Sequence, residues 1–328
     1  MYDFKCIEYP NLIGTTVLVK CTGPNGAGPE WLPIKQDWSE RWCTLSGPYT
    51  EDFAKRIDAF ATRETDVFLV SVMKSGSTWM QELAWLLLNK LDYEGALSEY
   101  GNVRNPYLEH SGIDEAFPGN SLETCDKIQT NPRLIKSHLP AQFLPRQVWT
   151  QGRKIIYVAR NAKDVVVSTY HYLYGIGVWE GSLDQFVDSF IDDKITFNPH
   201  WAHVIDFYRM RSEENIFFVT YEEMIRNLED VIRRLSRFVG CQDLSDCEME
   251  KLLNHLKFKN MKESKFGNHT NFFKTFHETK DDFDFMRRGI IGSYKDELSS
   301  EQVDKIDKWT QRCLQEYGIS ESDIFGEI

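Results

Sequence analysis

Residues 67–88 read VFLVSVMKSGSTWMQELAWLLL, and they predict a buried strand, a tight loop and an amphipathic helix. The strand is an apolar, β-branched run that begins at Val67, as in strands covered on both faces. The helix begins at Thr78, and its apolar side chains recur at helical spacing. The intervening loop, residues 73–78, points successive backbone N–H groups at one spot, and this spot lies at the positive end of the helix dipole. This unit predicts an anion-binding site.

Side chains of this loop favour phosphate or sulfate as the anion. Gly76 permits close approach, Lys74 adds a full charge, and Ser77 and Thr78 add hydroxyl donors. An ordinary strand-to-helix turn, with a Ser or Thr cap, is an open alternative. A nucleoside-triphosphate P-loop is disfavoured, because Lys74 precedes the only glycine, whereas GxxxxGK[ST] places the lysine after the second one.

The charge of the whole chain restricts its partners. The 328 residues carry a formal net charge of −12, which argues against broad binding of nucleic acid or acidic membranes. An anionic ligand therefore needs a local basic site, for which the candidates are Lys74, Arg160, Arg287 and Arg288. An aromatic content of 13% is sufficient for an aromatic pocket.

Cysteine usage and the absence of apolar runs bear on location. The seven cysteines form neither a CxxC nor a metal-ligand pattern, which favours a reducing, intracellular setting. The first residues lack the basic and apolar regions of a secretory signal. No apolar run approaches the roughly 18 residues that a membrane span requires. We expect a cytoplasmic protein without a membrane anchor.

Four stretches occur in the order and spacing of one enzyme family: KSGSTW at residues 74–79, IKSHLP at 135–140, YVARNAKDVVVSTYHY at 157–172 and FMRRGIIG at 285–292. Together they resemble the cytosolic sulfotransferases, whose phosphosulfate-binding loop is usually written KSGTTW. The resemblance runs from about Val67 onward and implies a single sulfotransferase domain over residues 1–328. Residues 1–65 have no clear counterpart, and we expect a leader segment packed on the core.

The resemblance implies a donor, 3′-phosphoadenosine 5′-phosphosulfate (PAPS), and a set of residues that hold it. Arg160 and Ser168 match the family's clamp on the 3′-phosphate, and Tyr221 matches a tyrosine at the adenine, although a capping or core role for Tyr221 is equally compatible. The residues that the resemblance assigns to the donor are Lys74, Ser75, Gly76, Ser77, Thr78, Trp79, Arg160, Ser168, Tyr221, Phe258, Met261, Phe285, Met286, Arg287, Arg288 and Gly289.

Three residues are candidates for catalysis. His138 follows a predicted strand, and parallel α/β sheets bind ligands at the carboxyl ends of their strands. A neutral imidazole there can take a proton from an attacking hydroxyl, whereas a lone loop histidine is more often structural. Lys74 would stabilise the departing phosphate, and Lys136 would align acceptor and sulfonate.

The acceptor pocket is predicted from aromatic residues. The run Pro-Tyr-Leu-Glu at residues 106–109 resembles the family's acceptor-lining segment and places Tyr107 in the pocket, with a surface loop as the alternative. Lys136, His138 and Tyr170 complete the predicted pocket. Phenols, catecholamines, steroids and other small alcohols all suit such an aromatic pocket, and an amine acceptor stays open.

The chain also departs from the family pattern. Leu256 and Lys257 replace the usual Thr-Ser, and Arg288 replaces a lysine. Ser299 and Ser300 replace the Thr-Val of the family's dimer motif, so we expect a monomer or a weak homodimer.

Two histidines raise the question of a metal. His200 and His203 lack an evident third ligand, and the family motifs require no metal, so we expect none.

Strands and helices alternate along the chain, which predicts an α/β fold with a central parallel sheet flanked by helices. The predicted function is transfer of a sulfonate from PAPS to a hydroxyl or amine of a small acceptor, with His138 as the general base. The alternatives are a P-loop nucleotide kinase, a dehydratase that acts by sulfating an allylic alcohol, and a non-catalytic protein that binds a small ligand.

Overall fold

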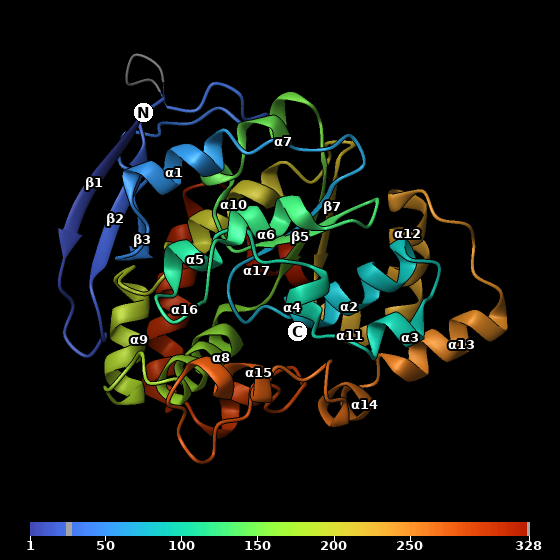
Figure 1. The fold of residues 1–328 in the computed structure, drawn as a ribbon. Coiled ribbons are helices and arrows are strands. Elements are labelled where there is room, and N and C mark those ends of the chain that lie inside the picture. Colours follow the sequence, from blue (N-terminus) through green and yellow to red (C-terminus); the bar gives the residue numbers. More distant parts are fainter. Residues whose placement is uncertain (24–27, 327–328) are drawn as a thin grey trace.

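The computed structural model describes residues 1–23 and 28–326, and within them two β-sheets (Figure 1). The central sheet has four parallel strands in the order β5-β4-β6-β7, which confirms the predicted fold class. The second sheet is antiparallel, in the order β1-β2-β3. The strands are β1 (Tyr2–Ile7), β2 (Thr16–Cys21), β3 (Cys43–Ser46), β4 (Val67–Ser71), β5 (Leu134–Ser137), β6 (Lys154–Ala159) and β7 (Ile216–Thr220).

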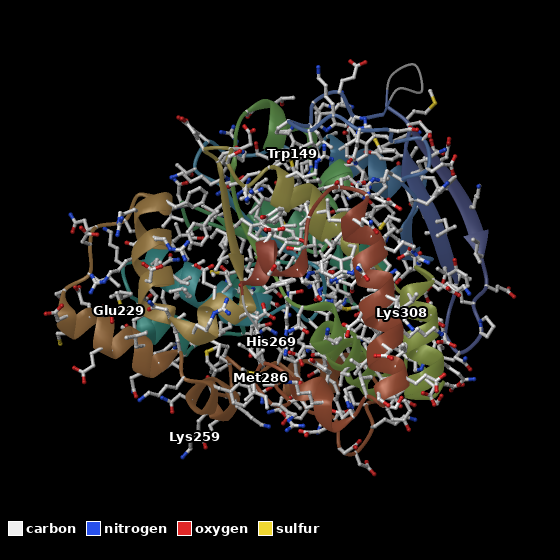
Figure 2. The ribbon with its side chains drawn as sticks, turned by 180° about the vertical axis from the view of Figure 1, so that it is seen from behind. Trp149, Glu229, Lys259, His269, Met286 and Lys308 are labelled. Atoms are coloured by element: carbon white, nitrogen blue, oxygen red, sulfur yellow. The ribbon has the colours of Figure 1, made fainter. Side chains whose placement is uncertain are left out.

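Helices cover both faces of the central sheet, because alternate strand residues point to opposite sides. Phe68 and Val70 belong to one buried cluster, with side chains of α8, α10 and α16, whereas Val67 and Leu69 belong to the other, with α2 and α12. Figure 2 shows the side on which Lys308 marks α16. The helices are α1 (Glu51–Asp58), α2 (Ser77–Leu88), α3 (Tyr93–Ala96), α4 (Gly101–Arg104), α5 (His110–Ile113), α6 (Ser121–Lys127), η2 (Ala141–Phe143), α7 (Arg146–Thr150), α8 (Ala162–Gly175), α9 (Leu183–Ile191), α10 (His200–Arg209), α11 (Tyr221–Arg226), α12 (Leu228–Val239), α13 (Asp246–His255), α14 (Phe258–Glu263), α15 (Thr270–Phe276), η3 (Ser293–Asp296), α16 (Ser300–Gln315) and α17 (Glu321–Phe325).

The register of the parallel strands brings three loops together. Val70 of β4 is opposite Ser137 of β5 and Tyr157 of β6, so the three strands end at nearly the same level. The residues that follow them therefore meet at one edge of the sheet, where open α/β sheets bind ligands.

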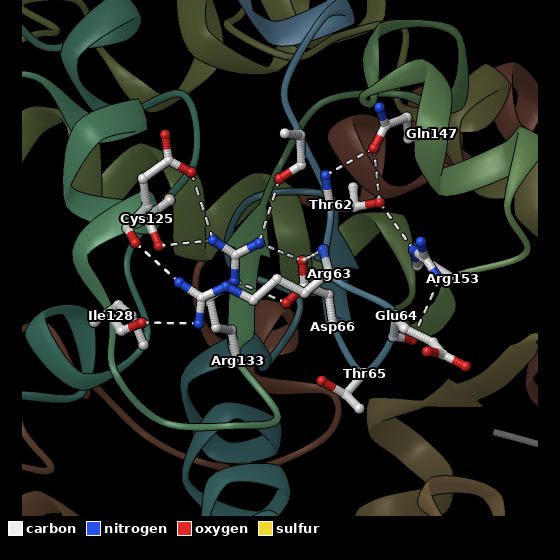
Figure 3. Close-up of polar contacts among 12 residues, drawn as sticks. Thr62, Arg63, Glu64, Thr65, Asp66, Cys125, Ile128, Arg133, Gln147 and Arg153 are labelled. Atoms are coloured by element: carbon white, nitrogen blue, oxygen red, sulfur yellow. Dashed lines mark hydrogen bonds and ion pairs between the residues drawn. The ribbon is translucent and has the colours of Figure 1, made fainter.

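The opposite edge of the sheet is closed by a buried ion pair (Figure 3). Arg133 donates from Nε to Asp66 Oδ1 at 2.8 Å and from Nη2 to Asp66 Oδ2 at 2.5 Å. It also donates to the carbonyl of Cys125, and its neighbour Arg63 donates to the carbonyl of Ile128. These contacts tie the segment after α6 to the base of the sheet, and both partners of the pair are fully buried.

The first 60 residues are more structured than the predicted leader. They form the antiparallel sheet and α1, and they pack on the main body: Tyr2 stacks on Phe143 at 6.0 Å, and Thr44 of β3 exchanges backbone hydrogen bonds with Phe197 and Asn198. One buried cluster runs from Tyr2 to Phe325, which supports our proposal of a single domain.

One helix boundary differs from the sequence expectation. The apolar spacing predicts one helix from Tyr221 to Gly240, but Asn227 separates α11 from α12. Its side chain accepts a hydrogen bond from the backbone N–H of Asp230, and such N-capping competes with continuation of the helix. Among the described helices, none is long and apolar enough to cross a membrane.

Candidate active site

A cavity lies over the carboxyl ends of the central strands and contains almost all the residues predicted from sequence. The predicted residues that line it are Lys74, Gly76, Ser77, Thr78, Trp79, Tyr107, Lys136, His138, Arg160, Ser168, Tyr221, Phe258, Met261, Phe285, Met286, Arg287, Arg288 and Gly289.

Two predicted residues do not line the cavity. Ser75 is fully buried behind the loop, and its hydroxyl has no hydrogen-bond partner among the described residues. Tyr170 stacks on Tyr174 at 5.7 Å and contacts Phe186 instead of the cavity, whereas Tyr172 lines it. Residues two apart on a helix differ by about 200° in direction, so the choice among the clustered tyrosines decides which one meets a ligand.

The loop before α2 has the geometry of an anion site. Gly76 is the N-cap, at φ = 98°, and no side chain caps this helix, so the alternative of an ordinary Ser or Thr cap is wrong. A side chain at Gly76 would lie 2.6 Å from the Tyr221 ring. Lys74 also has a left-handed backbone, with φ = 65°, a strained conformation that is frequent at binding loops. The first-turn N–H groups of α2 thus face the cavity without a side-chain cap.

Lys74 is a partly buried cation beside other cations. Its Nζ donates to the carbonyl of Phe285 at 3.2 Å and lies 3.8 Å from the Phe285 ring centroid. Burial, and then the charges of Lys136, Arg160 and Arg287, lower the pKa of Lys74 to about 7. A dianionic ligand would reverse this shift.

Lys136 repeats this situation on the next strand. Burial lowers its pKa to about 8, although the nearby charge of Glu109 acts in the opposite direction. Neither Lys136 nor Lys74 forms an ion pair within 4 Å in the part of the chain that the structure describes. Buried charges are normally paired, so these two ammonium groups favour the binding of an anion at this edge of the sheet.

Arg160 connects the loop to the far side of the cavity. It donates to the carbonyls of Lys74 and Ile290, at 3.2 Å each, and its guanidinium lies 4.3 Å from the centroid of the Tyr221 ring. Its Nε is buried without a partner among the described residues. Ser168, two turns into α8, lines the same cavity, so the predicted pair can converge on one ligand group.

The arginines after Phe285 have carboxylate partners. Arg287 pairs with Glu297, and Arg288 pairs with Asp296 at 2.6 Å. Gly289, at φ = 68°, lies against the ring of Phe258, where a side chain would approach to 2.1 Å. The two glycines of the donor end are therefore required both by backbone conformation and by close packing.

His138 is held in one orientation. Its Nδ1 lies 2.7 Å from the carbonyl oxygen of Ser71, which accepts a hydrogen bond from Nδ1–H and leaves the lone pair on Nε2 free to take a proton. Burial, and then the charge of Lys136, lower the pKa of His138 well below its usual value. The imidazole is therefore neutral at physiological pH, as a general base requires.

Glu109 holds the backbone at His138 in place, a role that the sequence interpretation missed. It accepts hydrogen bonds from the backbone N–H of His138 at 2.5 Å and from the Ser137 hydroxyl at 2.9 Å. Burial raises its pKa to about 7, against the effect of these hydrogen bonds. The signal lies in the run at residues 106–109, of which the sequence interpretation assigned only Tyr107 to the pocket.

Histidines of α10 are structural in this arrangement. His203 contacts the Tyr157 hydroxyl and the carbonyl of His138, and His200 is buried among aromatic rings. No group of three or more His, Cys, Asp or Glu suited to a metal occurs within residues 1–23 and 28–326.

A family model described as the sulfotransferase domain matches residues 64–318. The chain belongs to the sulfotransferase family. Luciferin sulfotransferase of Photinus pyralis is 34% identical over 280 residues, which cover 80% of this chain and 75% of the relative. Sulfotransferase 1 family member D1 of Mus musculus is 33% identical over 290 residues, which cover 85% of this chain and 89% of the relative.

Solved structures show the same fold. A retinol dehydratase in complex with androsterone and the inactive cofactor PAP superposes with a TM-score of 0.82 at 24% identity, covering 98% of each chain. A mouse sulfotransferase complexed with PAP has a TM-score of 0.66 at 22% identity, covering 90% of this chain and 96% of the other. At these identities the likeness concerns the fold alone.

The N-terminal segment of this sulfotransferase precedes the family match but contacts one wall of the cavity. The N–H of Ile13 donates to the carbonyl of Val178 at 2.9 Å, and the N–H of Glu180 donates to that of Asn11 at 2.9 Å. Val178 lines the cavity, as does Ser46 at the end of β3. The segment at residues 8–15, between β1 and β2, thus acts as a strap across this wall.

Proposed function

We propose that this sulfotransferase transfers the sulfonate of PAPS to a hydroxyl of a small phenolic or other apolar acceptor and releases the 3′,5′-bisphosphate, PAP. The observation that carries the proposal is the pair of ammonium groups of Lys74 and Lys136, which have no carboxylate within ion-pair distance among the described residues and lie beside an uncapped helix N-terminus. The PAP in two structural relatives supports the choice of donor.

The residues present fit such a donor. Arg160 lines the cavity, and its buried Nε has no partner among the described residues, as expected where an anion completes the bonding. Lys74 and the N–H groups before α2 would face the 5′-phosphosulfate. Arg160 and Ser168 would hold the 3′-phosphate, with Arg287 and Arg288 beside them, and Tyr221, Phe258 and Met261 would contact the adenine.

The proposed chemistry follows from the orientation of the side chains. The donor supplies an activated sulfonate. His138 takes the proton of the acceptor hydroxyl on Nε2 as the acceptor oxygen bonds to sulfur. Lys74 stabilises the negative charge that grows on the oxygen between sulfur and the departing phosphate, and Lys136 holds the reacting oxygens in line.

We also propose a compartment and an oligomeric state for the enzyme. The seven cysteines are all unpaired, which supports a reducing compartment such as the cytoplasm. The proposed oligomeric state is a monomer or a weak homodimer. Ser299, which stands in the altered dimer motif, is the N-cap of α16 in a capping box with Gln302.

The test is transfer of labelled sulfate from PAPS to a panel of phenols, catecholamines, steroids and aliphatic alcohols, with product analysis to detect dehydration of allylic alcohols. His138→Ala should retain affinity for PAP and lose about 10²–10⁴-fold in turnover. Near-normal turnover of this variant would contradict the assignment of the base. Tighter binding of ATP than of PAP would contradict the donor.

A further inference from the structure

A single carboxylate stands on the wall of the cavity at its acceptor end. Asp114 lines the cavity, and its side chain is 18% exposed. The surrounding walls are aromatic and aliphatic, and they include Tyr107, Ile113, Tyr172, Val178 and Phe273. A lone carboxylate in such a setting is the polar group that fixes the orientation of a ligand.

Asp114 is fixed by contacts from two distant parts of the chain. Its Oδ2 lies 3.0 Å from Nε2 of His277 and 3.5 Å from Nε2 of His110, and its Oδ1 accepts from the N–H of Ala116 at 3.0 Å. The His110 ring in turn stacks on Phe117 at 3.9 Å. This carboxylate is therefore preorganised before any ligand arrives.

The carboxylate remains charged at neutral pH. Burial raises its pKa, but the hydrogen bonds from His110 and His277 outweigh burial and hold the pKa of Asp114 below its usual range. Burial lowers the pKa of His110, so that this ring stays neutral and does not cancel the charge. Beyond burial itself, the negative charge of Asp114 also raises the pKa of Tyr172, on the cavity wall.

The carboxylate and His138 line the same cavity. The Tyr107 ring contacts His138 and also the histidine beside the carboxylate, with its centroid 5.2 Å from that of His110 and 5.2 Å from that of His138. A ring-sized acceptor whose hydroxyl meets His138 can therefore extend a second group toward Asp114. The two ends of the acceptor site differ in charge, because Lys74 and Lys136 are beside His138.

We propose that Asp114, held by His110 and His277, binds a hydrogen-bond-donating group, either a protonated amine or a second hydroxyl, on the side of an aromatic acceptor opposite its reacting hydroxyl. This inference rests on the proposed sulfotransferase reaction and narrows its acceptors to bifunctional molecules. A carboxylate at the same place on the acceptor is repelled, because it meets a like charge in a poorly hydrated cavity.

The experiment uses four phenols that differ only in the para substituent: 2-aminoethyl, 2-hydroxyethyl, ethyl and 2-carboxyethyl. Sulfation is measured as kcat/KM for the wild type, for Asp114→Asn and for Glu115→Gln. The last is a matched control, because Glu115 is an exposed carboxylate one residue away and does not line the cavity. Thermal unfolding verifies that each variant is folded.

We expect the wild type to prefer the aminoethyl or hydroxyethyl phenol over ethylphenol by about 10-fold or more, as for hydrogen bonds to a charged group. Asp114→Asn should abolish the preference for the amine and leave ethylphenol within about twofold, while Glu115→Gln retains the wild-type order. Loss of only the amine preference identifies an ionic contact, and loss of both identifies a general acceptor of hydrogen bonds.

Two outcomes overturn the inference. One is the same preference order in the wild type and in Asp114→Asn. The other is an equal fall for all four phenols, which would make Asp114 only a latch between its segment and His277. A binding measurement tests this inference independently of the reaction. Calorimetry with each phenol in the presence of PAP measures acceptor affinity, and hence the contact with Asp114, without turnover. Failure of the wild type to bind PAP would instead refute the proposed donor.

Discussion

The two edges of the central sheet differ in whether their cations have carboxylate partners. At the amino edge, Arg133 is 1% exposed and forms a bidentate pair with Asp66 (Figure 3). At the carboxyl edge, Lys136 is buried and Lys74 is partly buried, but neither has a carboxylate within ion-pair distance among the described residues. A buried pair belongs to the architecture, whereas a buried cation without a partner marks the place of a ligand.

The two unpaired lysines determine how the stability of the fold changes with pH. The folded pKa values of Lys74 and Lys136, about 7 and about 8, lie below the unfolded value near 10.5. Above pH 7 the unfolded chain therefore binds more protons, and these two groups make the free energy of unfolding rise with pH up to about 10.5. At neutral pH, the two lysines at the carboxyl edge lower the free energy of unfolding, and a bound anionic ligand restores it.

Removal of the ion pair between Arg133 and Asp66 at the amino edge should have the largest effect, and this effect is on stability. Arg133→Met leaves the Asp66 carboxylate buried and alone, so the free energy of unfolding should fall by about 3–5 kcal/mol. Urea denaturation measures it, with Lys74→Met as the matched control at the other edge. The control should leave stability unchanged or raise it, and a comparable loss in both variants would remove the distinction between the edges.

Breaking the open edge should affect the reaction. Lys74→Ala should lower kcat by about 10²–10³-fold, as for other preorganised donors to a developing anion, and should also raise the KM for the donor. Lys74→Arg should restore binding better than rate, because a planar fork cannot place a point charge on one oxygen. Steady-state kinetics at saturating donor decide the matter: an unchanged kcat in both variants would leave Lys74 a binding residue alone.

The pH dependence of PAP binding sharpens the comparison. A bound bisphosphate raises the pKa of Lys74 from about 7, so binding takes up protons. The affinity should fall above pH 7, at most about 10-fold per pH unit for each ammonium group that must be protonated. Calorimetry in buffers of different ionisation enthalpy measures this uptake, and proton release on binding would contradict the assignment.

The smallest effect is expected at the strap. Ile13→Pro removes the N–H that donates to the carbonyl of Val178 and should raise the acceptor KM a few-fold while PAP affinity is unchanged. Ile13→Ala retains that N–H and serves as the control. Equal effects on donor and acceptor would show that the strap supports the whole fold.

Much of the donor end could be predicted because its signals are local. The strand, loop and helix at residues 67–88 are contiguous, and His138 directly follows its strand. Contacts between distant residues left no such pattern: Asp114 meets His277 163 positions away. The strands of the N-terminal sheet were missed because β1 is short and buries only Tyr2, and its pairing with β2 is a tertiary property.

The strap between β1 and β2 has a consequence for how this enzyme can diversify. The donor residues lie within the region that the family shares, whereas Asn11 and Ile13 precede it and hold only the wall around Val178. Substitutions in the first 60 residues can therefore reshape the acceptor wall while the sulfonate chemistry is inherited intact. The acceptor specificity of the enzyme can therefore change while its donor site stays the same.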